Sequence, residues 1–223
     1  MDQNPYAPSF DDLPESLPIF PLYGVLLLPK GQLPLNIFEP RYVRMVDDAL
    51  KTHRMIGVIQ PKSAGENAEK SSLYTIGCAG KITEFVHMRD GRYSIALNGI
   101  CRFKIEVELD TGLAYRVVRP QWAAYQNDLA VKSCLDVDRD KLLELLRIYF
   151  EREGMSCDFQ KIKSIEDQNL MAALAMVCPF EPNEKQALLE QPCCVERSKL
   201  LMTMLEMAIC GGPGGGDDKK HWH

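Results

Sequence analysis

Apolar and polar residues alternate in short runs between residues 17 and 122, and glycines and prolines divide the runs. This period of two predicts β-strands, and many short strands with turn signals are typical of a barrel or a sandwich. In chain order, we expect strands at residues 19–22, 25–28, 32–37, 55–60, 74–87, 93–97, 101–108 and 114–121.

One helix interrupts this rhythm after Phe38, because Pro40 suits the first helical position and an apolar face of helical spacing follows it. Residues 89–92 read Arg-Asp-Gly-Arg and predict a hairpin turn in which Gly91 takes a positive φ. Residues 62–72 are polar and lack an apolar rhythm, so we expect a mobile loop there. The apolar face of the helix comprises Tyr42, Met45, Val46, Ala49 and Leu50.

The apolar spacing changes from two to about 3.6 past Asp136, which predicts that the second half is helical. A wide apolar face runs over residues 142–150. Ser164 followed by Asp167 resembles a capping box ahead of a helix at 170–177, and Pro182 opens a helix that continues to Leu189. A last helix is expected at 195–209.

The predicted fold class is therefore α+β, with a small N-terminal β-barrel followed by a C-terminal helical bundle. The first residues are rich in proline and acidic groups, whereas the glycine run at 211–216 cannot hold a helix. We expect a flexible N-terminal segment at 1–16, a β-barrel subdomain at 17–125, a helical subdomain at 126–210 and a disordered tail at 211–223.

Composition narrows the class of protein. Apolar residues make up 46% of the chain and charged residues 26%, as in ordinary globular proteins, and no apolar run approaches the roughly 20 residues of a spanning helix. The N-terminus has no features of a secretory signal, so we expect a cytoplasmic protein with no membrane partner. The net charge of −5 argues against a duplex nucleic-acid binder. The eight cysteines form no CxxC pair and are expected to be reduced, mostly buried thiols.

No pattern of catalytic or metal-binding chemistry stands out. The nearest string to a P-loop, at residues 78–82, has no hydroxyl after Lys81, and neither His53 nor His87 lies in a recognisable motif. The only close cysteine pair is adjacent in sequence, at 193–194, which does not suit a zinc site. We therefore expect no catalytic residue, metal or cofactor. The methionines at 171, 176, 202, 204 and 207 are expected to pack in the hydrophobic core, although methionine-rich faces also adapt to apolar ligands.

Three stretches carry a family resemblance. Leu17-Pro-Ile-Phe-Pro-Leu through Ile37-Phe-Glu-Pro-Arg-Tyr42 resembles the opening of the Lon protease N-terminal domain, and Ile76-Gly77 through Asn98-Gly-Ile-Cys-Arg-Phe103 resembles its strand and hairpin region. Residues 185–197 are similar to its helical part, and order and spacing match over about residues 17–209. The matching signature residues are Pro21, Phe38, Glu39, Pro40, Arg41, Tyr42, Gly77, Gly91, Arg92, Gly99, Arg102 and Phe103.

The resemblance implies a barrel like those of RNA-binding PUA-like domains, followed by helices, and a role in recognising protease substrates. The family's ATPase and Ser-Lys peptidase motifs do not occur in this chain. The expected function is thus a non-catalytic, stand-alone module that binds unfolded or exposed apolar polypeptide segments, or a folded protein partner. It would act as an adaptor or compete with a full-length Lon protease. The client and the oligomeric state stay open.

The signature residues also have a structural interpretation. Glu39 and Pro40 suit the start of a helix, Arg41 suits a carboxylate partner, and Gly91 and Gly99 suit turns.

Two other functions stay open from the sequence. The barrel could bind RNA or a small molecule, provided that the basic residues at 89, 92, 102, 104, 116 and 119 share one face. An undetected hydrolase would need a nucleophile beside His53 or His87.

Overall fold

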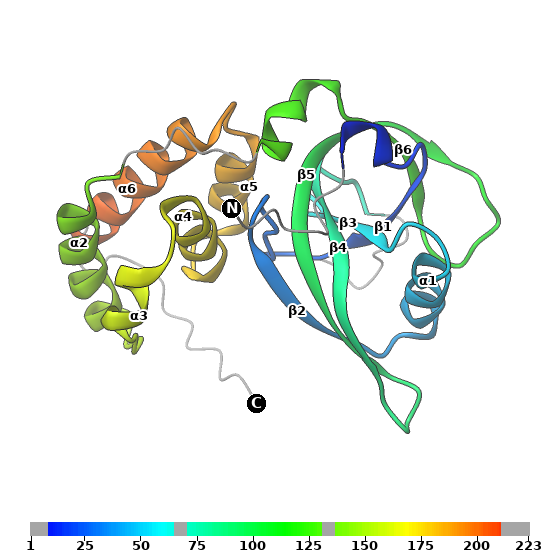
Figure 1. The fold of residues 1–223 in the computed structure, drawn as a ribbon, viewed down its shortest axis with the longest axis horizontal. Helices are drawn as coiled ribbons and strands as arrows, with labels where there is room; N and C mark the ends of the chain where they lie inside the picture. Colours follow the sequence, from blue (N-terminus) through cyan, green and yellow to red (C-terminus); the bar gives the residue numbers. More distant parts are fainter. Residues whose placement is uncertain (1–8, 65–70, 131–136, 211–223) are drawn as a thin grey trace.

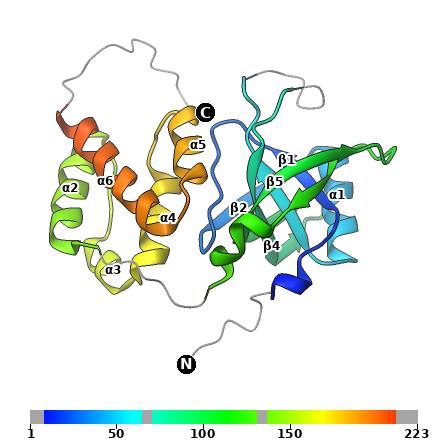
Figure 2. The ribbon, with the colours of Figure 1, turned by 90° about the horizontal axis from the view of Figure 1, so that it is seen from above.

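The fold has two parts that lie side by side, a β-sheet with one flanking helix and a group of helices (Figures 1 and 2). A computed structural model describes residues 9–64, 71–130 and 137–210. The class is thus mixed α and β, with a six-stranded sheet followed by a helical C-terminal part, as the sequence predicts at this level.

The sheet has the strand order β2-β5-β4-β3-β1-β6, and β6 also pairs with β5. Strands β5, β4, β3, β1 and β6 therefore follow one another in a ring of pairings, and β2 lies outside the ring on β5. Only the β1–β3 pairing among these is parallel. The strands are β1 (Leu17–Pro21), β2 (Gln32–Ile37), β3 (Met55–Ile59), β4 (Ile76–His87), β5 (Tyr93–Leu109) and β6 (Val117–Gln121).

Helix α1 follows β2 and lies on the side of the sheet away from the other helices (Figure 1). Two short 3-10 segments, η1 (Phe10–Asp12) and η2 (Ala123–Leu129), precede β1 and follow β6. The α-helices are α1 (Pro40–Leu50), α2 (Arg139–Arg152), α3 (Phe159–Ser164), α4 (Asp167–Val177), α5 (Pro182–Glu190) and α6 (Cys194–Cys210).

Several local predictions are confirmed. Helix α1 begins with Pro40 in its first turn and buries Tyr42, Met45, Val46 and Ala49, as its apolar spacing predicts. The β4–β5 hairpin turns through Gly91, whose φ is +84°. Helices α5 and α6 match their predicted ranges within one residue at each end.

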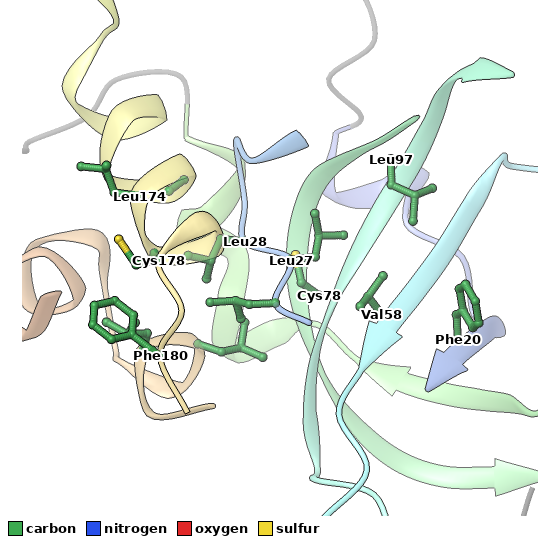
Figure 3. Close-up of a cluster of buried hydrophobic side chains, with 14 of the residues drawn as sticks. Phe20, Leu27, Leu28, Val58, Cys78, Leu97, Leu174, Cys178 and Phe180 are labelled. Carbon is green, nitrogen blue, oxygen red and sulfur yellow. The ribbon is translucent and has the colours of Figure 1, made fainter. Parts of the chain in front are cut away.

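The predicted strand at 25–28 is wrong, because this apolar run pairs with none of the described strands. Leu26, Leu27 and Leu28 are buried instead, and Figure 3 shows Leu27 and Leu28 where the sheet meets the helices. A short apolar run signals burial and cannot by itself distinguish strand pairing from other buried backbone.

Residues 93–108 form one long strand, so the predicted break and turn at Gly99 are wrong. Gly99 lies within β5, where its N–H donates to the Gly31 carbonyl at 2.8 Å and its carbonyl accepts from the Lys30 N–H at 2.9 Å. A Cβ at Gly99 would overlap the Leu28 carbonyl oxygen and lie 2.7 Å from its carbon. This glycine therefore permits a close backbone crossing and makes no turn.

The capping box predicted at Ser164 and Asp167 is also wrong. Ser164 ends α3, a helix that the sequence analysis did not predict, and its hydroxyl donates to the Lys161 carbonyl at 2.8 Å. Glu166 occupies the N-cap of α4. Asp158 caps α3 by accepting from two backbone N–H groups, and an aspartate before a helical run was the missed signal.

Two clusters of buried apolar residues occupy opposite faces of the sheet. Along β3, Ile56 and Val58 belong to the larger cluster, whereas Met55 and Ile59 belong to the smaller. The larger cluster continues without a break from α1 through the sheet to the helices, and Figure 3 shows Leu27 and Leu28 at its centre. Burial of this continuous apolar surface holds the two parts of the fold together.

A buried arginine adds polar contacts across the same junction. Arg102 of β5 makes a bidentate ion pair with Asp128, with nitrogen–oxygen distances of 2.8 and 2.9 Å. Its remaining N–H groups donate to carbonyls at the end of α5, those of Leu189, Gln191 and Pro192. Arg197 of α6 donates to the preceding carbonyl, that of Leu188, at 2.9 Å. Two guanidinium groups thus cap the C-terminus of α5, where partial negative charge gathers.

Part of the predicted flexible segment 1–16 contacts the sheet. Leu13 is buried, and the Pro14 carbonyl accepts a hydrogen bond from the Trp122 indole at 3.1 Å. Residues 1–8, most of the predicted mobile loop at 62–72 and the predicted tail 211–223 lie outside the described residues.

The described cysteines are free thiols, but fewer are buried than expected. Cys78, Cys101 and Cys178 are buried, whereas the other four described cysteines are at least partly exposed. Burial raises the pKa of both Cys101 and Cys178 to about 12, which makes these two thiols poor nucleophiles.

Candidate functional site

A groove of about 580 Å³ lies between α1 and the β4–β5 hairpin. Helix α1 forms one wall and the hairpin turn forms the other, and Figure 1 shows the hairpin extending beyond the body of the sheet beside α1. The lining residues are Phe38, Pro40, Val43, Arg44, Asp47, Asp48, Lys51, Asp90, Gly91 and Arg92.

Two tyrosines hold α1 in place at this groove. The Tyr93 hydroxyl donates to Asp47 at 2.7 Å, and the Tyr115 hydroxyl donates to Asp48 at 3.0 Å. Both acceptors are adjacent on α1, whereas the donors come from β5 and from the segment before β6. The position of the groove wall relative to the sheet is therefore fixed by hydrogen bonds as well as by apolar packing.

The second of these hydrogen bonds predicts a pH dependence. Burial, followed by the hydrogen bond to Asp48, raises the pKa of Tyr115 from 10.0 to about 12. Because the folded protein holds this proton more tightly, the contribution of Tyr115 to stability is complete below pH 10 and is lost as the pH rises towards 12. We expect Tyr115→Phe to lower the free energy of unfolding by about 1 kcal/mol at neutral pH. The variant should also lose less stability than the wild type at alkaline pH.

Denaturant unfolding at a series of neutral to alkaline pH values measures both effects. Tyr23→Phe, at an exposed tyrosine, is the matched control and should follow the wild type. An unchanged alkaline decline in Tyr115→Phe would contradict the assignment.

Large apolar side chains are exposed around the groove and along the hairpin. Phe38, at the mouth of the groove, is 67% exposed, and on β4 Phe85 and Val86 are 47% and 61% exposed. Met88, beside the hairpin turn, is 37% exposed. Single exposed apolar residues are ordinary, but several on neighbouring elements mark an interaction surface.

The same part of β4 has a strand edge without a partner. Strand β3 pairs with β4 only as far as Lys81, whereas β4 continues to His87 with β5 on its other side. No described strand pairs with the outer edge of residues 83–87, and all five residues are exposed. An edge of this kind presents free N–H and C=O groups that can pair with an extended chain.

The signature residues divide into two groups. Phe38, Pro40, Gly91 and Arg92 come from distant parts of the sequence and line the same groove. Glu39 lies beside them as the N-cap of α1.

The other signature residues support the fold. Arg41 pairs with Glu39 at 2.7 Å, and Tyr42 packs on Phe20 with ring centroids 4.3 Å apart. A Cβ at Gly77 would lie 2.7 Å from both the Phe103 ring and the Val58 carbonyl oxygen, so Phe103 fills the space above this glycine. The remaining members of this group are Pro21 in β1 and, as described above, Gly99 and Arg102.

The exposed residues of β4 and the tyrosine partners of Asp47 and Asp48 were not predicted from the sequence. Phe85 and Val86 are consecutive apolar residues in a strand whose other exposed positions are polar. Two such residues point to opposite faces of the strand, so at least one lies away from the core, which was the available signal.

Among the described residues, neither His53 nor His87 lies in a catalytic arrangement. His53 accepts a hydrogen bond from the Met55 N–H at 3.0 Å, and the His87 ring stacks on Tyr93 at 4.6 Å. Within the ranges that the structure covers, no Ser or Cys side chain donates to either imidazole, and no three metal-ligating side chains gather. In those ranges, no helix is both long and apolar enough to cross a membrane.

The six basic residues considered for RNA binding do not form one open face. Arg102 is buried, and Arg92 and Arg116 pair with Asp90 and Glu108 at 2.6 and 2.7 Å. Half of the set is therefore neutralised by carboxylates of the protein itself.

Comparison with known proteins gives the family. The model of the ATP-dependent protease La (LON) substrate-binding domain matches residues 16–207. The chain belongs to this family. Lon protease 2 of Myxococcus xanthus is 28% identical over 201 residues, which cover 87% of this chain and 24% of that protein. Lon protease of Anaeromyxobacter dehalogenans is 27% identical over 200 residues, which cover 87% of this chain and 23% of that protein. This Lon substrate-binding domain thus spans about a quarter of the length of these relatives.

Solved structures show the same fold. A Lon N-terminal domain protein from Xanthomonas campestris has a TM-score of 0.57 at 22% identity, covering 84% of this chain and 97% of that one. The N-terminal domain of Mycobacterium avium complex Lon protease has a TM-score of 0.54 at 17% identity, covering 86% of this chain and 98% of that one. The resemblance read from the sequence is therefore confirmed, and the matched region contains both the groove and the helical part.

Proposed function

We propose that this Lon substrate-binding domain is a non-catalytic recognition module for extended polypeptide segments, and that the segments bind at the outer edge of β4 and in the adjoining groove. The observation that carries the proposal is the coincidence of an unpaired strand edge at residues 83–87 with exposed apolar side chains at Phe38, Phe85 and Val86. Strand addition supplies backbone hydrogen bonds that any sequence can make, and apolar contacts add a preference for apolar side chains.

The charges of the groove are consistent with broad specificity. Three acidic side chains and three basic side chains line it. Arg44 and Lys51 both lie within 4 Å of Asp48, and Arg92 pairs with Asp90. With its charges paired in this way, the groove has no strong preference for one sign of ligand charge, which suits a module that accepts many unfolded segments.

Fluorescence anisotropy with a labelled unfolded polypeptide tests the proposal. We expect saturable binding to the wild type and at least roughly tenfold weaker binding to the double variant Phe38→Ser/Phe85→Ser, because two aromatic contacts are lost. Val177→Ser is the matched control, since Val177 is 62% exposed on α4 in the helical part. Substitution at exposed positions leaves the folded state intact, which circular dichroism checks.

A labelled single-stranded RNA, titrated in parallel at the same salt concentration, separates the two binding functions. Binding of the polypeptide but not the RNA supports the proposal, whereas binding of the RNA alone would replace it with the RNA-binding alternative. Equal affinity of the double variant and the control variant would place the polypeptide site elsewhere.

The barrel type, the adaptor role, the subdomain boundary and the cellular location stay predictions from the sequence. We propose that the ring of strands is a small barrel of the PUA-like type, a description supported by the pairing of β6 with both β1 and β5. The adaptor role, the division at residues 125 and 126, and the cytoplasmic location also stay predictions.

A further inference from the structure

A second hollow, of about 350 Å³, lies in the helical part and has no role in the proposed function. Its lining residues come from helices α2, α5 and α6, from the end of α2 and from the segment before α5. Its lining residues are Tyr149, Glu153, Pro179, Phe180, Glu181, Glu184, Met204, Met207 and Ala208.

The lining of this hollow is acidic and otherwise apolar. Glu153, Glu181 and Glu184 are its only charged members among the described residues, so it holds three carboxylates and no basic side chain. The basic residues adjacent in sequence to Glu153 and Glu184 are bound elsewhere. Arg152 donates to the Ala208 and Ile209 carbonyls at the end of α6, and Lys185 donates to the Gly24 carbonyl at 3.0 Å.

A buried tyrosine without a partner points to a ligand in the same place. Tyr149 lines the hollow and is only 3% exposed, yet no hydrogen bond joins its hydroxyl to any residue within the described ranges. Among the described residues, the only fully buried side-chain nitrogen or oxygen without a partner is Nη2 of Arg197, so the Tyr149 hydroxyl is accessible from the hollow and can hydrogen-bond with a group that enters it. Burial raises the pKa of Tyr149, and electrostatic interactions with Cys178, Glu153 and Glu184 raise this pKa further.

Aromatic and thioether groups complete the lining. The Tyr149 and Phe180 rings stack with centroids 6.2 Å apart, and Met204 and Met207 lie beside them on α6. Aromatic faces attract cations, and methionines adapt to alkyl chains of varied shape.

We propose that this hollow binds an organic cation, a protonated amine or guanidinium on an apolar stem. Glu153 and Glu184 face the charge, the Tyr149 hydroxyl accepts a hydrogen bond from it, and Phe180 with the methionines contacts the stem. The cation can be a free molecule or the side chain of a lysine or arginine in a polypeptide. This proposal does not rest on the groove at α1 and can succeed or fail independently of it.

Titration of the full chain with butylguanidinium chloride tests the site, with the neutral butylurea as the matched ligand. The readout is the methyl NMR signals of isotope-labelled methionines. We expect saturable shifts at Met204 and Met207 and none at Met45 and Met55, which lie in the sheet part. A blocked glycine peptide with a single lysine, titrated separately, distinguishes a basic side chain from a free cation.

The double variant Glu153→Gln/Glu184→Gln should bind the cation at least roughly tenfold more weakly, because both charge-assisted contacts are lost. Glutamine at 184 can keep the capping bond to the Glu181 N–H, so α5 should stay intact. Glu144→Gln, at an exposed position on α2 outside the hollow, is the control.

Shifts with either cationic probe that the double variant reduces and the control retains would support the site and identify the source of the cation. Equal binding of butylurea, equal weakening by the control variant, or no shift with any probe would overturn it.

Discussion

Replacement of Arg102 by methionine is expected to lower the free energy of unfolding by about 3 to 5 kcal/mol, because it leaves the carboxylate of Asp128 buried and unpaired. Arg102 is fully buried and makes both the ion pair with Asp128 and the contacts with the carbonyls at the end of α5. A loss of this size is a large fraction of the 5 to 15 kcal/mol that stabilises a typical domain. Urea unfolding followed by circular dichroism measures it.

Two further variants separate the charge from the packing. Arg92→Met removes the exposed ion pair with Asp90 and should leave the urea unfolding midpoint almost unchanged, because solvent screens such pairs. Arg102→Met/Asp128→Leu removes both buried charges and should recover part of the lost stability, because no unpaired carboxylate remains. A loss below 1 kcal/mol in Arg102→Met itself would show that the junction does not depend on this residue.

Gly99→Ala is expected to lower the free energy of unfolding by about 3 kcal/mol or more, since the added methyl group would overlap backbone atoms of Leu28. Backbone cannot move aside as a flexible side chain can. Separation of the two segments would also break the hydrogen bonds that Gly99 makes with Gly31 and Lys30. Thermal unfolding should show a markedly lower midpoint, with the 26–28 run loosened from the sheet.

Gly91→Ala is the matched control because its cost has a different cause. Gly91 has a positive φ, but no atom lies within 4 Å of an added Cβ. The Gly91→Ala variant should therefore lose only about 1 to 2 kcal/mol of unfolding free energy, because alanine is strained in this backbone conformation. Equal losses in the two variants would argue that the approach of Leu28 is not tight.

Elements with local signals could be predicted from the sequence. Pro40 and Pro182 mark the starts of α1 and α5, and the apolar face of α1 is buried as its spacing indicates. Gly91 marks the hairpin. In each case the residues that determine the conformation are neighbours along the chain.

Features set by contacts between distant segments could not be predicted. The 26–28 run looks like a strand because it is apolar, but its burial depends on helices that follow more than a hundred residues later. Gly99 looks like a turn, but its conformation is set by the close approach of Leu28. Nothing around Arg102 in the sequence indicates that its partners are Asp128 and the end of α5.

In the candidate site, too, some features have a signal in the sequence and others depend on contacts between distant segments. The signature residues of the groove were found by resemblance to the Lon family, but no sequence signal shows that Phe38 and Arg92 line the same groove. The unpaired edge of β4 depends on β3 beginning opposite Lys81, at Met55, which only the register of the sheet reveals.

Hydrogen exchange of the full chain, with and without saturating unfolded polypeptide, tests most directly whether the edge of β4 takes up an added strand. We expect slower exchange of backbone amides within residues 83–87 in the presence of the polypeptide, and unchanged exchange in α6, because strand addition gives these amides new acceptors. Unchanged exchange at 83–87 while the polypeptide is bound would contradict binding at this edge.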